Sequence, residues 1–274
     1  MTAAEPRRTR SGTTVDELYL VLRDRIIDGV YGPGYRMSQE DLAADLEVSR
    51  TPLREALRRL EADGFLVGAA NRGMQVAPIA NADTEQHYAL RLLVEPPVIS
   101  GLLGQITDED FGKMQTALGD MAASVDRTRE LQQAHKRFHD VALDRYPPAV
   151  RDLTRQLHTM IYRHQRVFFS RPRTPDDLVH TDQLYLDAMR RGDSGLVRQL
   201  LEFHLLDAAL GLVLDVDPDY RFDALLLALR GNGIELEHDG KGRVARPAAV
   251  RWIRRDAAAM PALSTTQLRY EPAS

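Results

Sequence analysis

The sequence predicts a mostly α-helical protein, with a small N-terminal domain, a larger helical bundle and a small α+β C-terminal extension. Residues 13–79 predict three helices followed by a two-stranded hairpin. Residues 83–217 repeat apolar side chains at helical spacing and show no strand alternation. Residues 218–274 mix a short helical segment with strand signals, and residues 1–12 predict a disordered basic arm. The length of 274 residues is enough for two domains.

Capping signals mark the starts of the first two helices. Thr14 is followed three residues later by Glu17, which is the spacing of a capping box. Ser38 precedes Asp41 by the same interval and predicts a second, short helix. Both helices are therefore expected to begin at a polar cap and to bury one apolar face.

A third helix and a hairpin complete the N-terminal domain. The helix is expected to start at Ser49, with Pro52 in its first turn, where proline is tolerated. Short strands are predicted at 65–67 and 74–76, around a turn at 71–73. Three helices followed by a hairpin are typical of a winged helix-turn-helix domain.

Composition excludes several classes of protein. The chain has a net charge of -4 and no cysteine, which rules out disulfides, thiolate metal sites and cysteine nucleophiles. No apolar run approaches the roughly 20 residues of a membrane span, and the N-terminus lacks the apolar stretch of a secretory signal. We therefore expect a cytoplasmic protein with no membrane partner. A local basic surface can still bind DNA, because binding depends on local charge.

The third predicted helix concentrates positive charge on one face. In residues 47–66 the apolar side chains recur on one helix face, and the other face carries Arg50, Arg54, Arg58 and Arg59. One interpretation is an ordinary solvated surface helix. The helix before it and the hairpin after it favour a recognition helix that enters the major groove, where arginine bonds guanine or neutralises phosphates.

Side chains at the start of this helix and at the tip of the hairpin are expected to contact DNA. The hydroxyls of Ser49 and Thr51 can donate to phosphates, and residues 50 and 54 share a helix face. The predicted DNA-contacting residues are Arg36, Ser49, Arg50, Thr51, Pro52, Arg54, Arg58, Arg72 and Gly73.

Residues 13–79 resemble the DNA-binding domain of the GntR family of bacterial transcriptional regulators. The resemblance is clearest over residues 29–66, which read GVYGPGYRMSQEDLAADLEVSRTPLREALRRLEADGFL. It implies a DNA interface at Ser49, Arg50, Thr51, Pro52 and Arg54, with Gly73 at the wing. At position 40 this sequence has Glu where fatty-acid-responsive relatives have an arginine, so that contact is not carried over.

Histidines in the helical half suggest a metal site. His135 and His139 are four residues apart, which places both imidazoles on one helix face as a divalent metal requires. His204 lies on a later predicted helix and could supply a third ligand. The alternative is a surface or core pair of histidines without a metal.

Residues 83–215 resemble the FCD effector domain of the FadR-like GntR subgroup, though more loosely than the N-terminal match. The resemblance rests on RLLVEPP at 91–97, RFH at 137–139 and DAMRRGDSGLVRQLLEFH at 187–204. It implies an all-helical bundle that often holds a metal through one Asp and three His, and that commonly binds small carboxylates.

The metal ligands implied by this resemblance are exchanged at two positions. His135 stands at the family's Asp position, and Asp182 stands at its first late His position. The implied set is His135, His139, Asp182 and His204. Three imidazoles and one carboxylate suit zinc, nickel or manganese. The alternative is a site that has lost its metal and binds the effector without one.

Two arginines are candidates for binding an effector carboxylate. Arg91 matches the family's RxxxE pattern with Glu95, and an inward arginine could bind a carboxylate with two hydrogen bonds. An ion pair between Arg91 and Glu95 within the helix is an equally good interpretation. Arg163 is a second, weaker candidate.

These features predict a sequence-specific transcriptional regulator, expected to be a repressor, that binds operator DNA as a homodimer and responds to a small carboxylate effector. Because one recognition helix reads few base pairs, we expect a homodimer that reads two paired half-sites. Two alternatives are a metal-dependent enzyme acting on a small carboxylate and an effector-independent DNA-binding protein. No nucleophile motif supports an enzyme, so we expect no catalytic residues.

The extension has no predicted function. Its sequence predicts a short helix at 222–229 and a hairpin of strands 234–237 and 243–245. Residues 248–260 have weak helical character, and residues 267–270 predict a strand.

Overall fold

Residues 14–69, 73–78, 80–169, 174–254 and 257–270 are described by the computed structural model. The chain divides into two units between Pro78 and Ile79. Each unit has its own hydrophobic core.

The first unit is a winged helix-turn-helix, as predicted. Its helices are α1 (Val15–Ile27), α2 (Gln39–Asp45) and α3 (Arg50–Ala62). Its strands are β1 (Arg36–Met37), β2 (Leu66–Ala69) and β3 (Gly73–Val76), in the antiparallel order β1-β3-β2. The short strand β1 was not predicted, because two residues carry too little alternation to be recognised in a sequence.

Local sequence signals account for the helices of this unit. Thr14 and Glu17 form the predicted capping box, and the Ser38 hydroxyl accepts a hydrogen bond from the Asp41 amide. Ser49 is the N-cap of α3, but its side chain makes no capping bond. The predicted apolar face of α3 is fully buried at Leu53, Ala56, Leu57 and Leu60.

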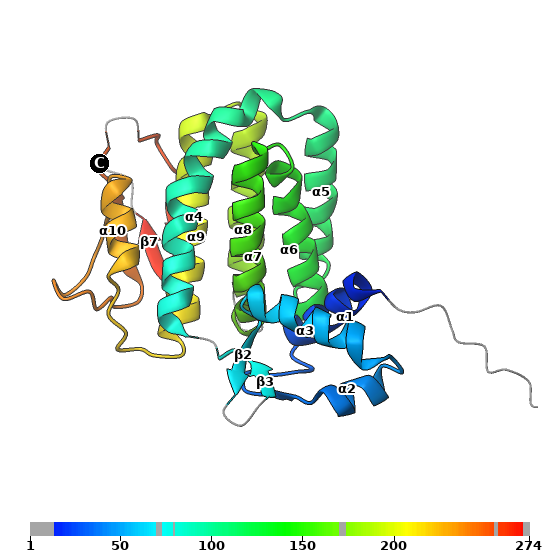
Figure 1. Ribbon diagram of the computed structural model, residues 1–274. Helices are drawn as coiled ribbons and strands as arrows, with labels where there is room; N and C mark the ends of the chain where they lie inside the picture. The colour runs from blue at the N-terminus through cyan, green and yellow to red at the C-terminus, as the bar shows by residue number, and fades with distance from the viewer. Residues whose placement is uncertain (1–13, 70–72, 79, 170–173, 255–256, 271–274) are drawn as a thin grey trace, which may run out of the picture. The chain divides into compact units, whose positions relative to one another are not determined.

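The second unit begins with a helical bundle. Its helices are α4 (Asn81–Leu102), α5 (Asp108–Ala122), α6 (Thr128–Leu143), α7 (Pro148–Phe169), α8 (Thr174–Arg190) and α9 (Ser194–Leu214), with a 3-10 turn, η1 (Leu103–Gln105), after α4. Figure 1 shows these long helices side by side, and α9 is buried along most of its length. Within the described ranges, none of the helices has the length and hydropathy to cross a membrane.

The C-terminal extension contains one helix and four strands. They are α10 (Ala224–Gly231), β4 (Ile234–Leu236), β5 (Ala248–Trp252), β6 (Leu263–Ser264) and β7 (Leu268–Tyr270), with the sheet order β4-β5-β7-β6. The helix expected at 222–229 and the strand expected at 267–270 are present with small shifts of their ends.

Two predictions for the extension were wrong. Strand β4 pairs with β5 rather than with residues 243–245, where Arg243 makes only an isolated bridge to Arg221. The Asp239 carboxylate accepts hydrogen bonds from the amides of Lys241 and Arg243, which forms a local turn instead of a hairpin. Residues 248–252 form a strand rather than a helix, because their alternating burial fits a sheet packed on the bundle.

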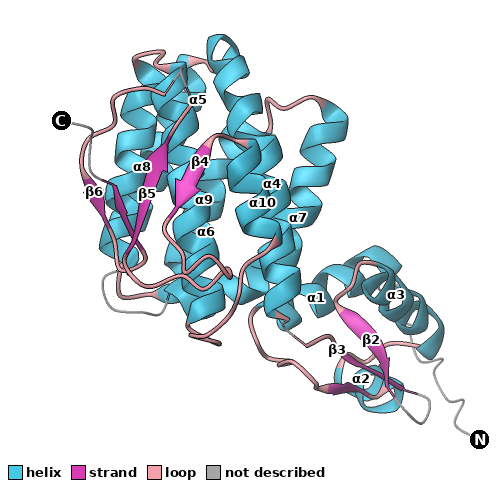
Figure 2. Cartoon of the chain, turned by 90° about the vertical axis from the view of Figure 1, so that its left-hand side faces the viewer, coloured by secondary structure: helices cyan, strands magenta, loops and turns pink. Residues whose placement is uncertain are grey.

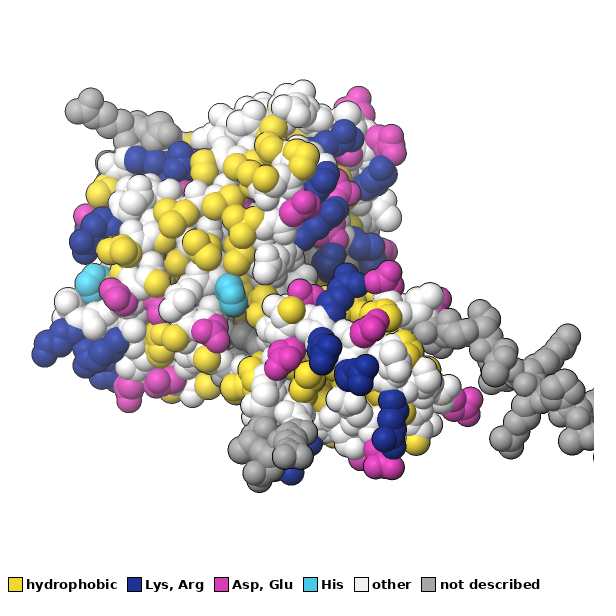
Figure 3. All heavy atoms as spheres, in the orientation of Figure 1, with side chains coloured by type: hydrophobic (Ala, Val, Ile, Leu, Met, Phe, Trp, Pro, Cys, Tyr) yellow, Lys and Arg dark blue, Asp and Glu magenta, His cyan; other side chains and the backbone are white. Residues whose placement is uncertain are grey.

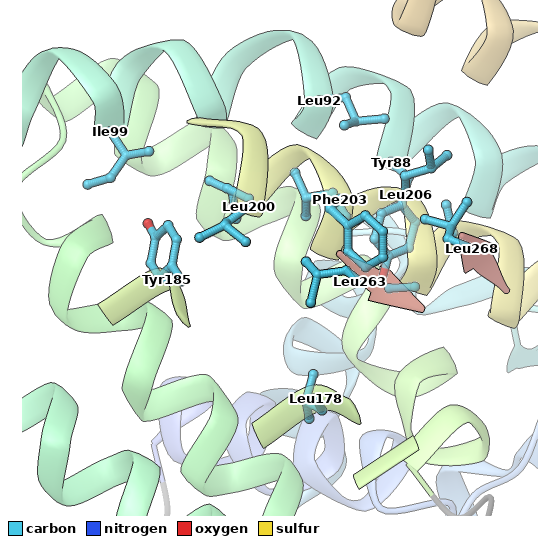
Figure 4. Packing of buried hydrophobic residues seen from close by; sticks show 14 of the residues in the cluster. Tyr88, Leu92, Ile99, Leu178, Tyr185, Leu200, Phe203, Leu206, Leu263 and Leu268 are labelled. Carbon is cyan, nitrogen blue, oxygen red and sulfur yellow. The ribbon is translucent and has the colours of Figure 1, made fainter. Parts of the chain in front are cut away.

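The extension packs directly on the bundle. Figures 1 and 2 place α10 and the small sheet on the side of the bundle that α4 and α9 form. Leu263 and Leu268 of the sheet lie beside Phe203 and Leu206 of α9 (Figure 4), within one continuous core. The extension is therefore part of the second unit.

Candidate metal centre and DNA-binding helix

Four side chains with metal-ligating atoms converge inside the bundle. His135 and His139 come from α6, Asp182 from α8 and His204 from α9, and one ligand atom from each lies within 4.8 Å of all the others. Nε2 of His135 lies 3.1 Å from Nε2 of His139 and 3.3 Å from Nε2 of His204. These are the four residues expected from the sequence, and the fold brings all of them together.

Helix geometry explains this convergence. His135 and His139 are one turn apart on α6, so their rings project from the same face. Asp182 lies on the inner face of α8 and is 1% exposed, whereas His180, two residues earlier, is exposed. Asp182, and not His180, therefore lies on the face that α8 presents to the bundle.

Burial controls the protonation of the cluster. Burial is the main cause that lowers the pKa of His139 and of His204 to about 4, so both imidazoles are neutral at pH 7. Burial also lowers the pKa of His135, with further lowering by the neighbouring histidines. Neutral imidazoles are the form that binds metal ions.

The carboxylate of Asp182 has little compensation for its burial. Oδ1 lies 3.5 Å from Nε2 of His139 and 3.6 Å from Nδ1 of His204. Oδ2 is buried and accepts no hydrogen bond from the part of the chain described. Burial raises the pKa of Asp182 to about 7, against the lowering effect of His204. A buried, unpaired carboxylate oxygen beside three neutral imidazoles is suited to binding a cation.

A second polar group is built around Glu95. Nε of Arg91 donates to Oε1 of Glu95 at 2.6 Å, and Nη2 donates to Oε2 at 3.2 Å. Nε2 of His158 on α7 lies 3.1 Å from Oε1 of Glu95. The predicted alternative of an ion pair within α4 is therefore present, and both partners are buried. The positive charge of Arg91 also contributes to the lowered pKa of His139 and His204, after burial.

His158 was not recognised in the sequence. It is a single histidine on a long amphipathic helix, and nothing in its local sequence distinguishes it from a surface residue. Only the packing of α7 against α4 brings it to Glu95. Arg163 lies on the same helix, but its side chain falls outside the described residues.

The third helix of the N-terminal unit presents a row of exposed arginines. Arg50, Arg54 and Arg58 are all exposed, as is Arg36 on β1. Nη2 of Arg50 lies 3.3 Å from Oε1 of Glu40, while Arg54 and Arg58 form no ion pair with any described residue. Ser49, Thr51 and Gly73 are exposed and Pro52 is partly exposed. Arg72 lies outside the described residues.

Arg59 differs from these three arginines. Its Nη1 donates to Oδ1 of Asp16 at 2.6 Å, and its guanidinium lies 4.1 Å from the centre of the Tyr19 ring. Both partners belong to α1, so Arg59 is used inside the unit. The outward row on α3 therefore consists of Arg50, Arg54 and Arg58.

Models of known families match both the N-terminal unit and the helical bundle. Residues 14–76 match the model described as bacterial regulatory proteins, gntR family, and residues 86–207 match the FCD domain. The chain belongs to the GntR family of bacterial regulatory proteins. Its relatives are named as transcriptional regulators or repressors, and the chain spans about half the length of two of them. The C-terminal extension, residues 218–274, lies beyond both matches.

Individual relatives of this GntR-family chain resemble it over different lengths. It is 25% identical over 131 residues to the uncharacterized HTH-type transcriptional regulator YdhC of Bacillus subtilis, a match that covers 47% of this chain and 58% of that protein. It is 25% identical over 209 residues to the galactonate operon transcriptional repressor of Escherichia coli, covering 67% and 90%. A crystal structure of a putative GntR transcriptional regulator from Rhodococcus sp. RHA1 is 26% identical, with a TM-score of 0.64 and coverage of 76% and 99%.

Proposed function

We propose that this protein is a repressor whose binding to operator DNA is controlled by a small carboxylate effector in a metal-containing helical domain. The observation that carries this proposal is the convergence of His135, His139, Asp182 and His204 inside the FCD-like bundle of a chain with a winged helix-turn-helix. We further infer that it acts in the cytoplasm, where its DNA would lie.

The exposed row on α3 supports the DNA-binding part of the proposal. Arg54 and Arg58 carry charges that no described side chain neutralises, so they are available for phosphates or guanine. Arg50 is partly compensated by Glu40, but both side chains are more than two-thirds exposed and can separate at little cost. Ser49, Thr51 and Pro52 at the helix start, with Arg36, Arg72 and Gly73 on the strands and the wing, complete the proposed interface.

The chemistry of the four buried ligands supports metal binding. Three nitrogen ligands and one carboxylate suit zinc, nickel or manganese, and the bound ion would compensate the charge of Asp182. A bound metal would also offer a coordination position to a carboxylate effector. Because His139 and His204 are already neutral at pH 7, they need not lose a proton before they bind a metal ion.

Arg91 is proposed as a second contact for the effector. Its Nε and Nη2 are held by Glu95, which fixes the plane of the guanidinium. Nη1 donates no hydrogen bond to a described residue and could bind an anionic oxygen. Arg163 remains a further candidate. One relative is named for the galactonate operon, and galactonate is a carboxylate, which agrees with this class of effector.

Two copies of the chain are proposed to act together, because two recognition helices are needed to read paired half-sites. A row of exposed apolar side chains on α4 supports a contact between copies. It comprises Leu90 and Leu93, each 45% exposed, and Pro97, and Leu227 on the adjoining α10 extends it. Figure 3 shows hydrophobic side chains gathered over this face.

Control of DNA binding follows from differential affinity. An effector shifts the protein towards the arrangement to which it binds more tightly, and only the difference in affinity counts. An inducer that favours an arrangement unable to reach both half-sites would release the operator. Repression and induction are thereby linked through one equilibrium.

The test is operator binding measured by fluorescence anisotropy with purified protein, with and without zinc and candidate carboxylates. The expected result is tight, salt-dependent binding that is released by one carboxylate in wild type and not in His139→Ala. Binding with no sequence preference and no release by any ligand would instead support an effector-independent DNA-binding protein. If a carboxylate still releases the operator from protein without metal, the response does not need the metal.

A further inference from the structure

Helix α9 makes contacts of two kinds on opposite sides. His204 projects towards Asp182 and the histidines of α6. Glu202, two residues earlier, projects from nearly the opposite side, because two residues turn an α-helix by about 200°. Its side chain is 0% exposed and is held mainly by the C-terminal extension.

Glu202 is a buried carboxylate with an unusually complete set of donors. Nε1 of Trp252 donates to its Oε2 at 2.6 Å, and Nη1 of Arg254 lies 3.0 Å from Oε1 and 2.8 Å from Oε2. Nε of Arg198, one turn earlier on α9, donates to Oε1 at 3.0 Å. A buried charge is tolerated only when it is paired and hydrogen-bonded, so α9 and the extension depend on each other here.

Other contacts hold the same side of α9. Gln199 and Leu206 share the face of Glu202, at helical spacing. The Gln199 side-chain oxygen accepts a hydrogen bond from the Ala258 amide, and Gln199 is 0% exposed. Leu206 lies beside Leu263 and Leu268 of the sheet, as Figure 4 shows. The extension therefore restrains both the rotation of α9 about its axis and the position of α9 along that axis.

We propose that the C-terminal extension positions α9 for metal binding, with Glu202 as the positioning residue for His204. This inference rests on the metal site proposed above. Metal coordination tolerates errors of only a few tenths of an ångström in ligand position. Groups that orient a ligand without touching the metal typically change affinity by 10–100-fold. A bond network on the outer side of α9 can act in this way, because the helix backbone transmits its rotation directly to His204.

Trp252 makes this coupling measurable. It is the only tryptophan of the chain, and its indole N–H is bonded to Glu202. A shift of α9 on metal binding changes the environment of that indole. A purely structural role of the extension, without coupling to the metal site, would leave the emission of Trp252 unchanged when metal is added.

The test uses the full-length protein, cobalt(II) as the metal probe and three variants. Cobalt absorption bands report the ligand geometry, and tryptophan emission reports the extension. Glu202→Gln keeps the shape of the side chain and removes its charge. Glu235→Gln is the matched control, because Glu235 pairs with Arg251 at 2.8 Å on the solvent side of the same sheet and is 49% exposed. His204→Ala removes the ligand itself.

We expect Glu202→Gln to bind cobalt about tenfold more weakly than wild type, with altered absorption bands, and Glu235→Gln to match wild type. The tryptophan response to cobalt is expected in wild type and absent in His204→Ala. If Glu202→Gln does not fold, Trp252→Phe removes the hydrogen bond from the indole to Glu202 and keeps an aromatic ring at the position that packs edge-on against Tyr270. The cobalt bands of this variant then decide.

Two outcomes would overturn the inference in different ways. Cobalt binding in wild type, with equal affinity and identical bands in a folded Glu202→Gln or Trp252→Phe protein, would refute the positioning role and leave the metal site intact. No binding of cobalt, zinc, nickel or manganese by wild type would refute the metal site and the inference together.

Discussion

Oδ2 of Asp182 lies 3.7 Å from Nε2 of His135, too far for a hydrogen bond and close enough for one metal ion to bind both. The two residues come from α8 and α6, and both are almost fully buried. Since that oxygen accepts no hydrogen bond from a described residue, those residues do not compensate its burial. The protonation of Asp182 should therefore be linked to metal binding.

Metal binding should release a proton from Asp182 rather than from the histidines. The pKa of Asp182 is raised to about 7 by burial, and the pKa values of His139 and His204 are lowered to about 4. At pH 6 Asp182 is mostly protonated and the imidazoles are mostly neutral, so about one proton should leave per zinc bound. Affinity should rise with pH up to about 7 and then level off. Calorimetry in buffers of different ionisation enthalpy measures this proton.

Asp182→Asn provides the control for that measurement. It should bind zinc more weakly and release almost no proton at pH 6, while the metal-free variant stays as stable as wild type, because the amide needs no charge compensation. Proton release that persists unchanged in Asp182→Asn would assign the proton to another group.

Replacing Arg54 should weaken operator binding. Arg54→Ala removes an exposed cation from the outward row on α3, and one base contact is worth about 1–3 kcal/mol. We expect roughly a 10- to 100-fold loss of affinity for the operator, measured by anisotropy at several salt concentrations. If Arg54 instead contacts a phosphate, its loss would weaken binding to all DNA sequences alike. The slope of log affinity against log salt concentration would then fall by about one.

Arg59→Ala is the matched control on the same helix. Arg59 is occupied by Asp16 and Tyr19 of α1, so its loss should cost some stability and leave DNA affinity within about twofold. Equal losses of affinity in Arg54→Ala and Arg59→Ala would argue that α3 does not present this face to DNA.

A charge placed on the apolar row of α4 should separate the two copies. Leu90→Glu introduces a carboxylate at a position that is 45% exposed in the single chain. If this face is buried between copies, the variant should be monomeric by analytical ultracentrifugation and should fold normally. Leu153→Glu, at a similarly exposed position on α7, should leave the oligomeric state unchanged. A Leu90→Glu protein that stays associated, or dissociation by Leu153→Glu alone, would place the contact elsewhere.

Gly242 should tolerate alanine less well than Gly240. Both glycines have positive φ, at +88° and +78°, so each substitution carries a backbone cost of about 1–2 kcal/mol. A Cβ at Gly242 would also overlap the carbonyl oxygen of Phe222, whereas a Cβ at Gly240 meets no atom within 4 Å. Urea unfolding should therefore show a larger loss for Gly242→Ala. Equal losses would mean that the segment around Phe222 moves freely away from the turn.

The sequence by itself determined the local elements and the ligand types. Capping residues such as Thr14 and Ser38 and the apolar face of α3 act between neighbours along the chain, so they predicted the winged domain well. His135 and His139 share a helix face for the same reason. Asp182 was found through a resemblance, since no local rule links it to His135.

Tertiary structure decided whatever depends on segments far apart in the chain. It brings Asp182 and His204 to His135, seats His158 on Glu95, and connects Glu202 to Trp252 and Arg254. It also makes residues 248–252 a strand, although residues 248–260 have weak helical character in the sequence, because a sheet packed on α9 buries alternate residues. Side-chain pairing over long sequence separations leaves no periodic trace, so only the folded chain shows it.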